Sequence, residues 1–147
     1  MNNLIAIGSD HAGFLIKEYI KEQLSKEDYV FKDFGCDSEE SVDYPDFIHP
    51  LAKSINNGEY KRGIIICGTG NGVSIVANKY LNVRAGLCWD EEITKFAREH
   101  NDANVIAIPA RFISKEEALK FVKLFLITSF EGGRHQRRVD KIKTILE

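Results

Sequence analysis

Residues 63–72 read Gly-Ile-Ile-Ile-Cys-Gly-Thr-Gly-Asn-Gly, and this stretch decides the fold. The apolar run over residues 63–67 predicts a strand, and the three glycines that follow break it at once. An apolar helical pattern then continues over residues 73–80. A strand, a glycine turn and a helix in that order are typical of an α/β protein.

The same alternation extends in both directions along the chain. We expect further strands at residues 4–8, 29–35, 83–88 and 104–108, and further helices at residues 14–25, 47–55, 91–100, 114–130 and from 134 to the end. The apolar run at residues 4–8 suits a strand buried on both faces. The sequence therefore predicts one α/β domain over residues 1–147, a three-layer Rossmann-like sandwich with a five-stranded parallel sheet and an extra C-terminal helix.

Composition excludes several classes of protein. The chain has 147 residues, of which 44% are hydrophobic, so it is too apolar for intrinsic disorder and suits a single domain. A net charge of −2 argues against a nucleic-acid partner. No apolar stretch approaches the roughly 20 residues that cross a bilayer. The N-terminus lacks the basic segment of a signal peptide, so we expect no membrane partner.

The three cysteines, Cys36, Cys67 and Cys88, cannot all pair within the chain, and their spacing matches no zinc pattern. We therefore expect reduced thiols, a cytoplasmic protein and no metal. Cys67 ends the strand at residues 63–67 and faces the amides of a helix N-terminus, a setting that favours a reactive thiolate. Cys36 and Cys88 are expected to be structural.

Ligands of such folds bind at the carboxyl ends of the strands. The glycine loop at residues 68–72 can present backbone N–H groups to an anion. Its spacing excludes three known motifs. Val73 stands where a dinucleotide fingerprint needs a glycine and where a cysteine-phosphatase loop needs an arginine. A Walker loop is excluded because the first lysine after the glycines is Lys79. A purely structural tight turn remains an alternative for the loop.

Two other groups of polar residues are candidates for the site. Asp10 and His11 follow the first strand, which normally lies beside the third in these sheets, so we expect them opposite Cys67. Arg134 and Arg138 are four residues apart and share one face of a helix, where two guanidinium groups can clamp a phosphate. A solvated basic helix is the alternative, with His135 on its more buried side.

Five motifs then make a family resemblance visible. They are Ser9-Asp10-His11-Ala12-Gly13, Asp43-Tyr44-Pro45, residues 66–74 around Cys67, residues 98–104 around His100, and residues 131–139 around Arg134. Together these motifs resemble type B ribose-5-phosphate isomerases, a family that includes allose- and galactose-6-phosphate isomerases. The resemblance covers essentially the whole chain. It departs from the family at Pro109, where a glycine is common, and at Leu87-Cys88-Trp89.

The resemblance implies an aldose–ketose isomerase that works through a cis-enediolate without a metal or other cofactor. Cys67 would be the general base, Thr69 would orient it, and His100 would donate the proton that opens the furanose ring. The amides of Gly68, Gly70, Asn71 and Gly72 would hold the enediolate oxygen, which Asn101 would also contact. Asp10 and Tyr44 would position the sugar hydroxyls, and the phosphate would bind Arg111, Arg134 and Arg138 with His11 nearby.

The residues leave alternatives open. A six-carbon sugar phosphate could replace ribose 5-phosphate as substrate. A nucleotide-binding module or a non-catalytic subunit of a larger isomerase could share the fold, although neither needs Cys67 and His100 together.

The expected topology also separates the site residues. His100 and Asn101 follow a helix and precede the fifth strand, so they belong at the opposite edge of the sheet from Cys67. A five-residue strand spans roughly 17 Å, which is too far for His100 to reach the thiol of its own chain. The sequence therefore predicts a homodimer or tetramer with composite sites. Arg134 and Arg138 are expected to cross to the partner as well.

Overall fold

The computed structural model describes residues 3–143 and contains one parallel sheet of five strands. The strands are β1 (Leu4–Ser9), β2 (Val30–Asp33), β3 (Gly63–Cys67), β4 (Ala85–Leu87) and β5 (Val105–Pro109). They lie in the order β2-β1-β3-β5-β4. The predicted five-stranded parallel sheet, with the first strand beside the third, is confirmed.

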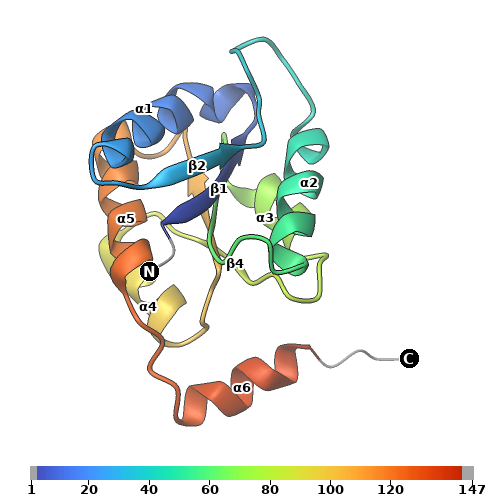
Figure 1. The fold of residues 1–147 in the computed structure, drawn as a ribbon, viewed down its shortest axis with the longest axis vertical. Helices are drawn as coiled ribbons and strands as arrows, with labels where there is room; N and C mark the ends of the chain where they lie inside the picture. The colour runs from blue at the N-terminus through green and yellow to red at the C-terminus, as the bar shows by residue number, and fades with distance from the viewer. Residues whose placement is uncertain (1–2, 144–147) are drawn as a thin grey trace.

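Helices cover both faces of the sheet (Figure 1). They are the short 3-10 helix η1 (His11–Gly13), α1 (Phe14–Ser25), α2 (Tyr44–Asn56), α3 (Asn71–Ala77), α4 (Glu91–Glu99), α5 (Lys115–Ile127) and α6 (Arg134–Ile142). One layer contains α1, α4 and α5, and the other contains α2 and α3. The extra C-terminal helix α6 lies below the sandwich in Figure 1. Within the described chain, no helix has the length and apolar character needed to cross a membrane.

The core is divided by the sheet into two clusters. On one side, Ile5, Ile7 and Ile64 of the strands pack with apolar residues of α1 and α5 such as Ile20 and Phe125. On the other side, the alternate strand residues pack against α2 and α3. All five residues of β3 are buried, as are all five of β5. Burial on both faces explains why these strands have continuous rather than alternating apolar sequences.

Helix α1 has the predicted bounds, whereas α2 and α3 begin earlier than predicted. Helix α2 starts at Tyr44 because Pro45 is tolerated in a first turn, where its missing N–H costs no hydrogen bond. Helix α3 starts at Asn71 because Gly70 takes a left-handed conformation (φ 76°) that turns the chain. It stops at Ala77 because the Asn78 side chain bonds both backbone polar groups of Ala85.

The C-terminal helices differ from prediction in their ends. Helix α5 stops at Ile127, three residues early, because Thr128 is extended and its carbonyl accepts a hydrogen bond from Arg98 Nε at 3.0 Å. Its start is as predicted: Ser114 and Glu117 form a reciprocal capping box. Helix α6 is described as far as Ile142, and the predicted continuation through residues 144–147 lies outside the described residues.

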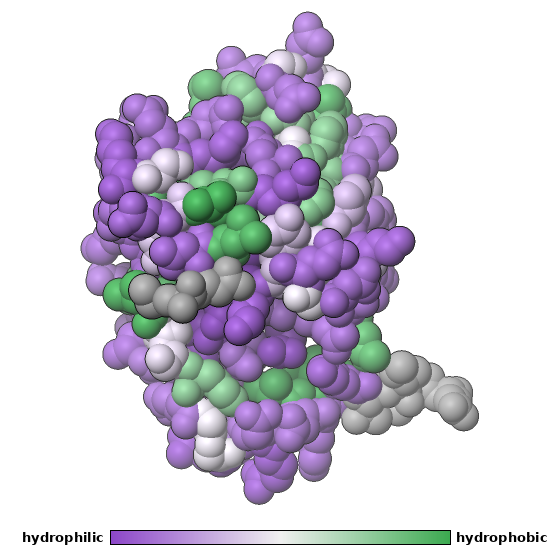
Figure 2. All heavy atoms as spheres, viewed as in Figure 1, coloured by the Kyte–Doolittle hydropathy of each residue, from purple (hydrophilic) through white to green (hydrophobic). Residues whose placement is uncertain are grey.

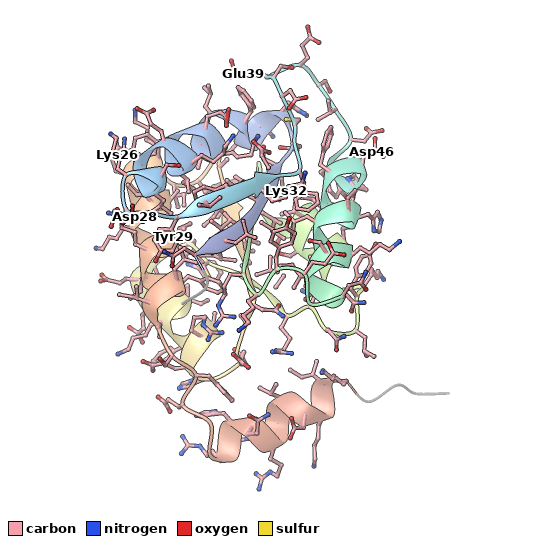
Figure 3. All side chains as sticks on the ribbon, viewed as in Figure 1. Lys26, Asp28, Tyr29, Lys32, Glu39 and Asp46 are labelled. Atoms are coloured by element: carbon pink, nitrogen blue, oxygen red, sulfur yellow. The ribbon has the colours of Figure 1, made fainter. Side chains whose placement is uncertain are left out.

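An ion pair fixes α1 on the edge of the sheet. Lys17 is 1% exposed, and its Nζ lies 2.6 Å from Asp33 Oδ2, which Lys21 Nζ also contacts at 2.7 Å. Asp33 Oδ1 accepts a hydrogen bond from Gly35 N–H at 2.8 Å. Burial by itself would raise the pKa of Asp33, but these hydrogen bonds outweigh it and hold the pKa below its usual value. By contrast, Lys32 on the same strand is exposed at the sheet edge (Figure 3), where a charge discourages pairing with other chains.

Because its folded-state pKa is lowered, Asp33 stabilises the protein above its unfolded pKa, and this contribution is lost as the pH falls through the folded pKa. We therefore expect Asp33→Asn to lower the free energy of unfolding by about 2 kcal/mol at neutral pH. The difference from wild type should narrow below about pH 4. Urea denaturation across this pH range measures it, and a difference that does not change with pH would contradict the assignment.

Candidate active site

The carboxyl ends of β1 and β3 lie side by side at the point where the strand order reverses. Ser9 pairs with Ile66 in the parallel register, and Asp10 N–H donates to the Ile66 carbonyl at 3.2 Å. Asp10, which follows β1, and Cys67, the last residue of β3, therefore meet at one edge of the sheet. This edge is where ligands bind in open α/β sheets.

Two amides of the glycine loop donate hydrogen bonds to side chains that lie shortly before them in the chain. Gly70 N–H donates to Cys67 Sγ at 3.1 Å, and Asn71 N–H donates to Thr69 Oγ1 at 3.2 Å. The left-handed Gly70 permits this turn, and a Cβ there would collide with the Leu87 side chain. A hydrogen-bond donor on sulfur stabilises a thiolate over a thiol. The loop thus places a backbone donor directly on the sulfur of Cys67.

The β1 end is fixed by a second tight turn. Asp10 Oδ1 accepts hydrogen bonds from Ala12 N–H at 3.0 Å and Gly13 N–H at 3.2 Å, so the carboxylate caps η1. A Cβ on Gly13 would lie 2.6 Å from the Ile66 side chain, so only glycine lets η1 approach β3 this closely. His11 Nδ1 accepts a hydrogen bond from Val42 N–H at 3.1 Å, which ties the loop before α2 to the site.

A pocket of about 380 Å³ opens at this edge. It is lined by Asp10, His11, Ala12, Tyr44, Cys67, Gly68, Thr69, Gly72 and Arg111. The Tyr44 ring packs so closely on Gly72 that a Cβ there would lie 2.6 Å from it. The structure therefore brings together most of the site residues expected from the sequence, with Gly70 and Asn71 in the same loop. The acidic loop, residues 34–43 between β2 and α2, carries Glu39 and projects beyond α2 (Figure 3).

Arg111 reaches the pocket in spite of Pro109. Pro109 ends β5 opposite Cys67, Ala110 N–H donates to the Cys67 carbonyl at 2.9 Å, and Arg111 N–H donates to the Gly68 carbonyl at 3.0 Å. These two bonds hold the Arg111 loop against the glycine loop. Trp89 lies in a neighbouring pocket that it shares with Thr69 and Phe112.

The remaining four expected site residues lie at the opposite edge of the sheet. His100 and Asn101 follow α4 and precede Asn104, whose carbonyl accepts from the first residue of β3, Gly63. Arg134 and Arg138 are on α6, which lies below this amino-terminal edge (Figure 1). None of the four lines the Cys67 pocket. The single chain therefore divides the expected site into two halves.

The His100 half is organised by stacked rings. The His100 ring lies between Phe96, at 4.6 Å between ring centroids, and His135, at 4.3 Å. Glu131 Oε2 is 3.5 Å from His135 Nε2. Burial of His135, with the nearby His100 and Arg134, lowers its pKa and favours the neutral imidazole. Sequence reasoning missed Phe96 and Glu131 here, although Phe96 is four residues before His100 and Glu131 four before His135.

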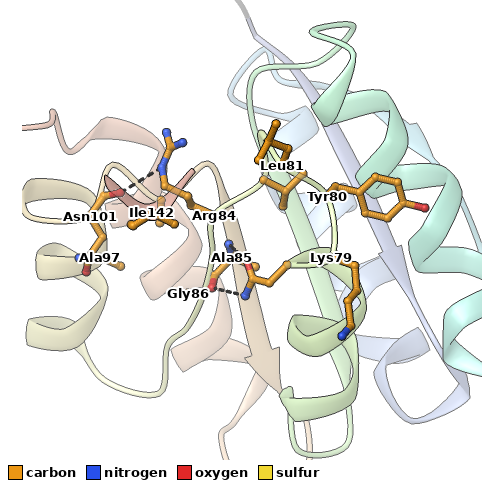
Figure 4. A pocket seen from close by; sticks show the side chains of 12 residues that line it. Lys79, Tyr80, Leu81, Arg84, Ala85, Gly86, Ala97, Asn101 and Ile142 are labelled. Carbon is orange, nitrogen blue, oxygen red and sulfur yellow. Dashed lines mark hydrogen bonds between the residues drawn. The ribbon is translucent and has the colours of Figure 1, made fainter. Parts of the chain in front are cut away.

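Asn101 borders a separate pocket of about 570 Å³ between α4, the α3–β4 loop and α6 (Figure 4). The Asn101 carbonyl accepts from Arg84 Nε at 3.2 Å, and Ile142 closes the pocket from α6. Figure 2 shows apolar atoms along the line where α6 meets the rest of the molecule.

The other two cysteines have structural environments. Cys36 Sγ donates to the Ser38 carbonyl at 3.3 Å, and Cys88 is fully buried in the core. Burial raises the pKa of the Cys88 thiol to about 11. All three cysteines are free.

Comparison with known proteins agrees with this geometry. The model of the family described as Ribose/Galactose Isomerase matches residues 5–142. A putative sugar phosphate isomerase of Bacillus subtilis is 46% identical over 139 residues, 94% of this chain and 93% of the relative. Ribose-5-phosphate isomerase B of Escherichia coli is 41% identical over 141 residues (96% and 95%). A D-erythrulose-4-phosphate isomerase of Pectobacterium atrosepticum is 40% identical over 139 residues (94% and 91%).

Solved structures have the same fold. A ribose 5-phosphate isomerase of Thermotoga maritima has a TM-score of 0.92 and 47% identity, covering 95% of this chain and 97% of its own. Ribose-5-phosphate isomerase B of Mycoplasma genitalium, solved with bound ribulose-5-phosphate, has a TM-score of 0.90 and 42% identity, covering 95% and 93%.

We expect iodoacetamide to alkylate Cys67 before Cys36 and Cys88. Cys67 lines the pocket and its sulfur accepts a hydrogen bond, whereas Cys88 is buried with a pKa of about 11. Inorganic phosphate should slow the labelling, because Arg111 lines the same pocket. Peptide mass spectrometry of timed samples at neutral pH measures both effects. Faster labelling of Cys36 or Cys88 would count against a reactive thiol at the glycine loop.

Proposed function

Because the chain belongs to the ribose/galactose isomerase family and is a sugar-phosphate isomerase, we propose that it interconverts ribose 5-phosphate and ribulose 5-phosphate with Cys67 as general base. The observation that carries this proposal is the 3.1 Å hydrogen bond from Gly70 N–H to Cys67 Sγ, in a pocket that Arg111 also lines. A base for a sugar carbon and a cation for the phosphate thus face one space. The three free thiols fit a reducing cytoplasm.

The proposed reaction moves one proton between neighbouring carbons. The Cys67 thiolate removes the proton from C2 of the open-chain aldose, and an enediolate forms. The resulting thiol returns the proton to C1 while the hydroxyl proton of O2 moves to O1, so no net proton, metal or other cofactor is consumed. A thiolate suits this task because a general base works best when its proton affinity matches ambient pH.

The loop amides have separate roles in this proposal. The Gly70 amide keeps its hydrogen bond to Cys67 Sγ, and the Asn71 amide keeps its hydrogen bond to Thr69 Oγ1. These two bonds fix the loop beside Cys67. The enediolate oxygen is then stabilised by the remaining amides between Gly68 and Gly72, at about 3 kcal/mol for each well-placed donor. Asp10 and Tyr44 position the sugar hydroxyls from the two sides of the pocket.

The second half of the site comes from a neighbouring subunit in this proposal. His100, Asn101, Arg134 and Arg138 lie together at the edge of the sheet that cannot reach Cys67 of the same chain. A two-fold dimer brings the His100 edge of one chain to the Cys67 edge of the other, and it does so twice. His100 then donates the proton that opens the furanose ring, Asn101 contacts the enediolate, and Arg134 and Arg138 complete the phosphate site with Arg111 and His11.

The alternatives concern the sugar. Family membership removes the nucleotide-binding module. Allose 6-phosphate and galactose 6-phosphate remain, and the Pectobacterium relative adds D-erythrulose 4-phosphate. A non-catalytic subunit is disfavoured because Cys67 and His100 are both present.

We expect turnover to be fastest with ribose 5-phosphate among these four sugars, and Cys67→Ala to abolish it. The variant should also stop exchange of the C2 hydrogen with deuterated solvent, because that exchange requires the base. NMR measures turnover and exchange together. Cys88→Ala is the matched control, a buried thiol away from the pocket that should leave both intact. Exchange at the wild-type rate in Cys67→Ala would assign the base to another group, with Asp10 the first candidate.

Mixing two inactive variants tests the composite site. Cys67→Ala and His100→Ala are combined under conditions in which subunits exchange. Random pairing makes about half of the dimers mixed, and each mixed dimer has one intact site, so activity should recover to about a quarter of wild type. If mass spectrometry shows mixed dimers while activity stays absent, His100 acts within its own chain.

A further inference from the structure

Three side chains that bind metals well meet beside α6. His100 follows the last residue of α4, Glu131 lies between α5 and α6, and His135 is in the first turn of α6. One ligand atom from each lies within 4.8 Å of the other two. We propose that this His100–Glu131–His135 cluster binds a divalent transition-metal ion such as Zn²⁺, and that the bound ion inhibits the enzyme by occupying His100.

The first argument is an unsatisfied nitrogen. The His135 side chain is only 9% exposed, and its Nε2 has no hydrogen-bond partner within residues 3–143. Glu131 Oε2, at 3.5 Å, is near this nitrogen without forming a hydrogen bond to it. Burying an imidazole nitrogen without a partner costs free energy, because the nitrogen loses its hydrogen bonds to water and forms none within the protein. A metal ion between His135 and Glu131 would give this nitrogen a partner.

The second argument is the chemistry of the donors. Two imidazoles and one carboxylate are the ligand set of several zinc sites, in which water takes the fourth position. Glu131 and His135 are four residues apart, and the Glu131 side chain is half exposed, so it is free to turn toward a shared ion. Arg134 and Arg138 are close enough to disfavour a cation at His135. The binding energy must therefore come from the imidazole ligands, which favour Zn²⁺ and similar ions over Mg²⁺ and Ca²⁺.

The geometry requires a modest closure. With metal–ligand distances of about 2.0–2.1 Å, ligand atoms around a tetrahedral ion lie about 3.3 Å apart. The three donors must therefore approach one another by up to about 1.5 Å from their present limit of 4.8 Å. The His100 and His135 rings are stacked at 4.3 Å and 11°, so they would turn away from parallel as their nitrogens converge. The ion then occupies a nitrogen of His100, the residue proposed above to open the furanose ring.

The binding test uses the full chain with Cys67→Ala, so that the reactive thiol cannot be a ligand. Calorimetric titration with Zn²⁺ should give one ion per chain. Adding His135→Ala or Glu131→Gln should weaken the affinity by about tenfold or more. His49→Ala, which removes an exposed histidine of α2, is the control and should not change it. With Co²⁺, the absorption spectrum should lack thiolate charge-transfer bands.

Equal zinc affinity in the parent, Glu131→Gln and His135→Ala would overturn the site. Glu131→Gln changes a half-exposed side chain to one of nearly the same shape, so this variant should fold normally. The test therefore remains decisive even if His135→Ala fails to fold. The inhibition rests on the proposed role of His100 and is measured separately with Cys67 present. Zn²⁺ should inhibit the wild type at least tenfold more strongly than Glu131→Gln, and EDTA should reverse it. If both variants lose zinc binding but Zn²⁺ inhibits the wild type and Glu131→Gln equally, the site is supported. Its proposed effect on turnover is then overturned.

Discussion

The hydrogen bond from Gly70 N–H to Cys67 Sγ is the interaction on which the rest of the site depends. It exists because β3 ends at Cys67 and the chain turns back within three residues, which requires a left-handed residue at position 70. The same turn starts α3, so the thiol, the free amides and the helix N-terminus are aligned by one backbone conformation. Leu87 fills the space that a side chain at position 70 would need.

The positions of the strands along the chain follow from burial and were largely predictable, as was the placing of β1 beside β3. Continuous apolar runs such as residues 63–67 specify strands with two covered faces, and the predicted bounds of β3 and α1 agree with the structure. Helix ends were harder to predict when a distant side chain decided them. Asn78 ends α3 by bonding to Ala85, and Arg98 ends α5 by bonding to Thr128. Neither partner can be identified from local periodicity.

The candidate site, too, could be predicted in part from the sequence. Residues at the carboxyl ends of β1 and β3 could be grouped from topology alone, and Asp10, Cys67 and Arg111 do line one pocket. Topology also separated His100 from them, because it follows a helix rather than a strand. The stack of His100 on His135 could not be predicted, since the two residues are 35 positions apart and meet only through the packing of α6. Contacts of this kind depend on how the layers are joined.

The hydrogen bond between Val42 N–H and His11 Nδ1 determines which tautomer His11 adopts. A backbone amide can only donate, so Nδ1 must be the acceptor and the hydrogen of a neutral ring must be on Nε2. His11 can therefore offer an uncharged N–H to an anion in the pocket, beside the permanent charge of Arg111. The position of the acidic loop and the tautomer of this ring are thus linked through one nitrogen.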